Sequence, residues 1–132
     1  MNLEIDKEGI FIPEFNGNKK LPSTDQITVR YRTPTVAIKN RCRKKPQAKG
    51  IASANGSIEH MEITVEKDET TTVKEMLVSI SGCSYSGKDD KAVLIVSAQD
   101  LFNAPINFEP LLKEIVDEFD NILDHSGINE KN

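Results

Sequence analysis

The chain has 132 residues, of which 37% are apolar and 29% charged, and it contains two cysteines and no tryptophan. A chain of this length can bury roughly two-thirds of the surface that its unfolded form exposes, so one core can form without disulfide bonds or bound metal ions. The longest apolar run, Ala92 to Val96, is far shorter than the ~20 residues of a membrane-spanning helix. We therefore expect a single intracellular domain over residues 1–132, with reduced thiols at Cys42 and Cys83.

The charge is unevenly distributed along the chain. The net charge is −4, but the segment from Lys19 to Lys49 has ten basic residues and one acid, which leaves −13 for the remainder. A basic segment on an acidic body suggests polar contacts between copies or with a charged partner.

The beginning of the chain is predicted as β structure. Leu3–Ile5 and Ile10–Ile12 flank a candidate turn at residues 6–9, and Asn16-Gly17 is a stronger turn signal. Residues 26–32 alternate polar and apolar side chains, as a half-buried strand does. These segments predict a small antiparallel sheet.

The next segments mix helix and strand signals. Thr33-Pro34 predicts a helix start, and the helix is expected to run from residue 35 to Lys45 and to end at Pro46. Residues 47–57 are rich in small residues, which predicts a flexible loop. Residues 58–65 fit both periods, and we favour a strand.

A helix over residues 72–81 is predicted from its capping and its period. Residues 68–72 offer several caps, and Thr72-x-x-Glu75 is a capping box. Gly82 would end this helix, and residues 84–90 would form a solvated loop. The helical apolar spacing comes from Val73, Met76, Leu77 and Ile80.

The last third is predicted as an extended run followed by two helices. Residues 92–96 are extended, and Ser97-x-x-Asp100 opens a short helix that Pro105 ends. Asn107 would cap the last helix, with Pro110 in its first turn. One apolar stripe of this helix is formed by Leu111, Leu112, Ile115, Val116, Phe119, Ile122 and Leu123.

These segments predict an α+β fold, with a small N-terminal antiparallel β-sheet followed by a mainly helical C-terminal half. Residues 1–33 form the β-rich part, residues 34–124 the mainly helical part and residues 125–132 a frayed tail.

The stretch SGCSYSGKDD places Gly82, Gly87 and Lys88 at the spacing of a phosphate-binding loop. Such a loop requires a buried strand before it, a helix after it, and a Ser or Thr after the lysine. Here the preceding segment has helical periodicity, and Asp89 and Asp90 follow the lysine. The sequence therefore favours a surface loop over a nucleotide site.

No constellation of residues predicts catalysis, a metal ion or a cofactor. His60 and His125 make no ligand spacing with the cysteines, and neither lies beside a nucleophile motif. The carboxylates of the last helix lie opposite its apolar stripe, as in a solvated face. We therefore expect a protein that is not an enzyme and has no cofactor.

The stretch KNRCRKKPQAK, residues 39–49, carries six positive charges and no acid. We rank a solvated helix end first, contact with an acidic protein surface second, and nucleic acid third, because no aromatic residue is interleaved for stacking. The acidic surface could be the last helix of another copy, which would give a homo-oligomer. The candidate partner-binding cations are Arg41, Arg43, Lys44 and Lys45.

The segment FIPEFNGNKKLPSTDQITVRYRTPT resembles the beginning of tail assembly chaperones of long-tailed bacteriophages and prophages. VKEMLVSISGCSY, VSAQDLFNAP and FEPLLKEIVDEF add to the likeness in segment order, which extends from about Gly9 to Leu123. The resemblance implies a non-enzymatic assembly factor in the host cytoplasm, absent from the mature virion. Its partners would be the tape-measure protein and the tail-tube protein.

A chaperone of a long helical client needs apolar surface, and the stripe of the last helix could supply part of it. Core packing is the competing interpretation for most of the stripe. The candidates for an exposed part are Leu111, Ile115, Phe119 and Ile122. Alternative functions are a structural head-tail connector or tail-completion protein, and a small nucleic-acid-binding protein that uses residues 39–49.

Overall fold

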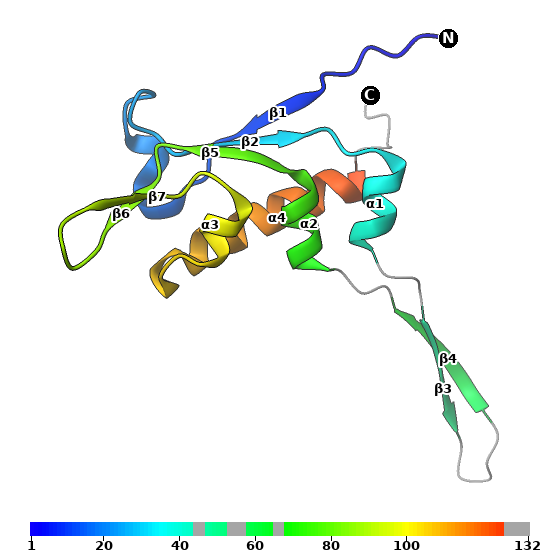
Figure 1. Ribbon diagram of the computed structural model, residues 1–132. Coiled ribbons are helices and arrows are strands. Elements are labelled where there is room, and N and C mark those ends of the chain that lie inside the picture. Colours follow the sequence, from blue (N-terminus) through cyan, green and yellow to red (C-terminus); the bar gives the residue numbers. More distant parts are fainter. Residues whose placement is uncertain (44–46, 53–57, 65–67, 126–132) are drawn as a thin grey trace.

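The computed structural model describes residues 1–43 and 68–125, and the backbone of residues 47–52 and 58–64. A three-stranded antiparallel sheet covers one side of a group of helices (Figure 1). The predicted α+β class is confirmed, with an antiparallel sheet near the beginning of the chain and a long helix near its end. The sheet consists of β1 (Glu8–Phe11), β2 (Thr28–Arg32) and β5 (Leu77–Ser81).

Strand β2 is the centre of this sheet, with β1 on one side and β5 on the other. Gly9 lies opposite Tyr31, and Val29 lies opposite Ile80. The predicted hairpin between Leu3–Ile5 and Ile10–Ile12 is wrong, because β1 begins inside the expected turn and pairs with β2. Two very short strands make a marginal hairpin, whereas β2 offers a longer ladder.

The predicted helix over residues 72–81 is only half right. Helix α2 (Glu69–Met76) is capped by Asp68, whose side chain accepts a hydrogen bond from the Thr71 N–H, so the capping box at Thr72 does not form. The chain then continues directly into β5. Val78 and Ile80 are β-branched and favour a strand, and β2 provides a free edge for pairing.

Helix α1 (Val36–Cys42) begins at Thr35, whose side chain accepts a hydrogen bond from the Ile38 N–H. The helix is shorter than predicted, and Lys44 to Pro46 lie outside the described residues. The predicted loop over residues 47–57 is wrong in its first part, because β3 (Gln47–Ala52) pairs antiparallel with β4 (Ile58–Thr64). The strand favoured for residues 58–65 is confirmed, and this hairpin projects away from the helices (Figure 1).

The predicted loop at residues 84–90 is a second hairpin. Strand β6 (Ser84–Ser86) pairs with β7 (Ala92–Leu94), and Asp90 has a left-handed φ of 61° in the turn between them. The next element after Lys88 is strand β7 and not a helix. The glycine and lysine spacing is therefore not part of the strand–loop–helix arrangement of a phosphate-binding loop.

The last third contains α3 (Ala98–Phe102) and the 17-residue α4 (Glu109–His125). Ser97 caps α3 as predicted, since its hydroxyl accepts a hydrogen bond from the Asp100 N–H. Asn107 does not cap α4, because the short 3-10 helix η2 (Ile106–Phe108) leads directly into it. His125, predicted as the first residue of the frayed tail, is the last residue of α4, and residues 126–132 lie outside the described residues.

One apolar core joins the sheet to the helices. Helix α4 is its largest contributor, and Phe119 packs against the Tyr31 ring of β2 with the ring centroids 5.7 Å apart. The fully buried large apolar side chains are Phe119, Met76, Ile80, Ile95, Leu111, Ile115, Leu123, Val29 and Val73.

Candidate functional site

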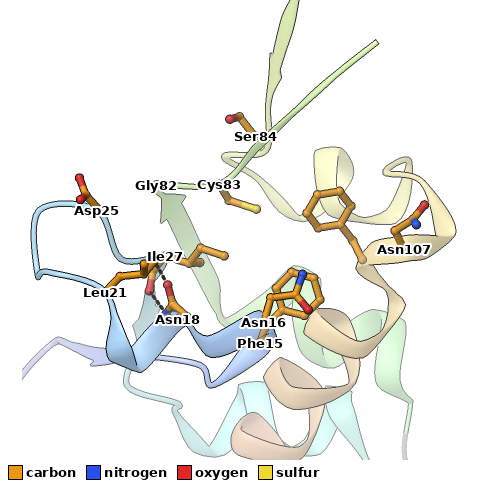
Figure 2. A pocket seen from close by; sticks show the side chains of 11 residues that line it. Phe15, Asn16, Asn18, Leu21, Asp25, Ile27, Gly82, Cys83, Ser84 and Asn107 are labelled. Carbon is orange, nitrogen blue, oxygen red and sulfur yellow. Dashed lines mark hydrogen bonds between the residues drawn. The ribbon is translucent and has the colours of Figure 1, made fainter. Parts of the chain in front are cut away.

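A recess of about 310 Å³ lies between the loop that joins β1 to β2, the end of β5 and the 3-10 element η2 (Figure 2). The loop contains the 3-10 element η1 (Phe15–Lys20). Three parts of the chain that are distant in sequence therefore meet here. The lining residues are Phe15, Asn16, Asn18, Leu21, Asp25, Ile27, Gly82, Cys83, Ser84, Asn107 and Phe108.

Aromatic rings form one side of the recess. The Phe108 ring lies 5.7 Å from the Phe15 ring and 5.7 Å from the Tyr85 ring, measured between centroids, and both pairs are tilted. Tilted pairs at this separation are favourable arrangements of aromatic rings. The three rings come from η2, η1 and β6, so their packing joins these otherwise separate elements.

The buried side chain of Asn18 fixes the shape of the loop. Its Nδ2 group donates hydrogen bonds to the Pro13 carbonyl at 2.9 Å and the Ile27 carbonyl at 3.0 Å. Its Oδ1 atom accepts one from the Ile27 N–H at 2.6 Å. A single amide thus holds both ends of the loop, and Figure 2 shows its bonds to Ile27. The recess is therefore a preformed feature.

Three residues with left-handed backbone conformations shape the same wall. The predicted Asn16-Gly17 turn is confirmed, with φ values of 49° and 75°. Gly82 has a φ of 74°, and a Cβ atom there would lie 2.3 Å from the Gln26 carbonyl oxygen. Only glycine permits this backbone approach, so Gly82 brings the end of β5 against the β1–β2 loop. The prediction that Gly82 ends a helix is therefore wrong, because strand β5 precedes it.

The lining of the recess mixes apolar and polar side chains. Among the described residues, Asp25 is the one charged side chain that lines it. Burial raises the pKa of the Cys83 thiol, so this sulfur stays protonated and is a poor nucleophile. Asn16 and Asn107 can donate to and accept from a peptide backbone. The recess can therefore hold an apolar side chain and the adjoining main chain.

A second recess, of about 510 Å³, adjoins the first. The two share Asp25, Gly82, Cys83 and Ser84. The second recess continues past Ile80 to the exposed side chains of Leu94 and Val96. Together the two recesses form a surface that is lined in part by apolar side chains and is longer than one side chain of a ligand would fill.

Two of the predicted cations, Arg41 and Arg43, do not line the recess and are already paired. Arg41 is half-exposed and its Nη2 lies 2.8 Å from Glu75 Oε1. Arg43 is 10% exposed, and its guanidinium lies 3.2 Å from Asp120 Oδ1 and 3.0 Å from Asp124 Oδ1. The basic segment thus contacts the acidic last helix of its own chain. Lys44 and Lys45 lie outside the described residues.

The stripe of α4 faces the core. Leu111, Ile115 and Phe119 are fully buried, so none of them offers surface to a partner while the chain is folded. Ile122 is partly buried against the core. Core packing, the competing interpretation of the stripe, accounts for the first three candidates.

The sequence analysis missed the recess because its residues share no period. The signals were the Asn16-Gly17 turn, which was found, and Gly82, which was assigned to a helix end. Asn107 was expected to cap α4 and instead lies beside the recess (Figure 2).

Some kinds of site are absent from the described part of the chain. Residues 1–43 and 68–125 contain no cluster of three or more His, Cys, Asp or Glu that could hold a metal ion. In the described residues, no helix combines the length and the apolar character that crossing a membrane requires. Comparison with protein-family models, with curated proteins and with solved structures found no match to this chain.

Proposed function

We propose that the chain is a non-enzymatic binding protein that holds an apolar segment of a client protein in the recess beside Phe15 and Phe108. The observation that carries this proposal is a recess held in shape by Asn18 and Gly82, with the aromatic rings of Phe15 and Phe108 in its wall and one charged side chain among the described lining residues. Ligand sites combine apolar side chains with a few polar groups that orient the ligand. Asn16 and Asn107 would be these orienting groups.

The client class comes from the resemblance to phage tail assembly chaperones. A tape-measure protein is a long helical chain with repeated apolar positions, and the two adjoining recesses suit more than one such position. The proposed function is therefore to keep the tape-measure protein soluble while tail-tube subunits assemble around it in the host cytoplasm. This role requires surface complementarity and no catalysis.

A structural head-tail connector is the second candidate. Residues 1–7 are an extended, exposed arm with apolar side chains, as in subunits that link to neighbours. Mass spectrometry of purified particles distinguishes the two functions, because a connector remains in the particle and a chaperone is missing from it.

The binding site is tested by pull-down of the tagged chain from producing cells, followed by mass spectrometry. Two exposed apolar residues provide matched variants. Leu21 lines the recess, whereas Val36 lies on α1, away from it. Burial of a leucine contributes about 1.5–3 kcal/mol, so Leu21→Asp is expected to lower client recovery by at least about tenfold. Val36→Asp is expected to bind as the wild type does.

The identity of the recovered partner tests the client class. We expect a very long, helix-rich protein together with a tail-tube subunit. Portal or capsid proteins would favour the connector, and recovery that nuclease abolishes would favour nucleic acid. Equal client recovery with Leu21→Asp and the wild type would show that the client does not bind in the recess.

A further inference from the structure

The first residues of the chain have the pattern of a sheet strand without a sheet. Apolar Met1, Leu3 and Ile5 alternate with polar residues, as in a strand that is buried on one face. All of residues 1–7 are exposed, and Leu3 and Ile5 are 71% and 64% exposed. Figure 1 shows this arm extending beyond the sheet. The segment therefore lacks the partner that its pattern implies.

The neighbouring strand β1 has an open edge. In the part of the chain that the structure describes, β1 pairs only with β2. The Lys7 carbonyl accepts a hydrogen bond from the Thr33 N–H, at the hydrogen-bonded end of the ladder. Alternation along an antiparallel pair then directs the backbone N–H and C=O groups of Glu8 and Ile10 to the open side. These groups are a template for another strand.

The two faces beside this edge differ in chemistry. Arg30 and Arg32 are exposed on the outer face of β2. On the opposite face the Tyr31 ring lies across Gly9, where a Cβ atom would approach the ring to 2.4 Å. The outer face of β1 carries Glu8, whose carboxylate lies 3.7 Å from Arg30 Nε. An added strand would therefore meet Glu8 and the exposed Ile10 on one face and the aromatic ring beside Gly9 on the other.

The arm matches the face that carries the Tyr31 ring. A strand on the open side of β1 presents its side chains alternately to the two faces of the sheet. When Leu3 and Ile5 lie on the side of the Tyr31 ring, the polar residues Asn2, Glu4 and Asp6 lie on the exposed outer face. One alignment thus places the apolar side chains beside the ring and Gly9 and leaves the polar ones in contact with water.

We propose that two copies of the chain associate through this edge, with residues 1–7 of each copy added as a strand to β1 of the other. The contact is self-complementary, because each copy carries one arm and one open edge and an antiparallel pair has two-fold symmetry. The commitment to a second copy comes from the match between the alternating pattern of the arm and the open edge beside the Tyr31 ring, both of which every copy carries. It goes beyond the proposed client binding and uses surface outside the recess.

Sedimentation of the full chain over a range of concentrations tests the proposal. The mass of one chain is 14.7 kDa, and the wild type is expected to approach twice this value as concentration rises. Replacement of Leu3 and Ile5 by serine is expected to hold the mass at that of one chain. Asn2→Ser, on the polar side of the arm, should still associate.

The edge is tested separately with Ile10→Pro, which removes an N–H that points outward and leaves the ladder to β2 in place. Ile10→Thr keeps this N–H and is the control. A mixture of the double-serine variant, which has an intact edge, and Ile10→Pro, which has an intact arm, retains one arm–edge contact. The mixture is therefore expected to form a mixed dimer although each variant alone remains a single chain.

Two results would overturn the proposal. The wild type could remain a single chain at every concentration, or the double-serine variant could associate as the wild type does. A single-chain wild type whose arm is needed for client recovery would assign the arm to the client. If Ile10→Pro fails to fold, the serine variants still decide, because the arm is outside the core.

Discussion

Helix α4 and the recess differ in how the sequence encodes them. Helix α4 shows a regular stripe in the sequence, and Leu111, Ile115 and Phe119 of that stripe are fully buried. The recess has no sequence period and assembles from η1, the end of β5 and η2. The regular pattern marks the side chains that hold the fold, and the irregular one marks the surface available to a ligand.

The largest expected effect is at the centre of the stripe. Phe119→Asp removes a buried ring, and loss of such a ring alone costs about 3–5 kcal/mol. It also buries a charge, so the variant should be unfolded, given a typical domain stability of about 5–15 kcal/mol. Asn121→Asp, at an exposed position of the same helix, should melt as the wild type does. Circular-dichroism melts compare the two, and a folded Phe119→Asp would show that the stripe is not core.

A smaller loss is expected from the ion pairs that join α4 to the basic segment. Arg43→Ala leaves the buried Asp120 without its cation and should destabilise the fold by about 2–4 kcal/mol. The 52% exposed Arg41 bonds Glu75 at the surface, and Arg41→Ala should change the melting temperature very little. Urea titrations of the two variants measure this contrast. Equal effects would mean that Arg43 does not help to hold α4.

A still smaller loss of stability is expected at the wall of the recess. A left-handed alanine costs about 1–2 kcal/mol, which both Gly17→Ala and Gly82→Ala incur. Gly82→Ala also forces the β1–β2 loop away from β5, whereas the Cβ atom of an alanine at position 17 would meet no atom within 4 Å. Gly82→Ala should therefore lose more stability and also client affinity. Equal client affinity of the two variants would show that the contact at Gly82 does not contribute to client binding.

The elements with a local chemical signal could be predicted from the sequence. The alternation over residues 26–32, the cap at Ser97 and the stripe of α4 each correspond to an observed element. These signals arise from contacts within a few residues, so local reasoning is sufficient for them.

Other features depend on partners distant in the chain. The three-residue spacing of Leu77 and Ile80 suits a helix, but pairing with β2, whose register is irregular between Arg30 and Tyr31, makes the segment a strand. Gly82 has the pattern of a helix end, and its contact with the Gln26 carbonyl is visible only in the fold. The charge pattern predicted contact between the basic segment and the acidic last helix of another copy, whereas Arg43 pairs with the last helix of its own chain. Long-range contacts determine all three.

Hydrogen-exchange mass spectrometry of the chain with and without its recovered client tests the central claim most directly. Amides slow their exchange where a ligand covers or orders them. The account predicts protection in residues 15–27, 82–84 and 106–108, around the recess, with α1 unchanged. Protection confined to α1, which carries Arg41, would contradict this prediction and place the client-binding site on the basic surface.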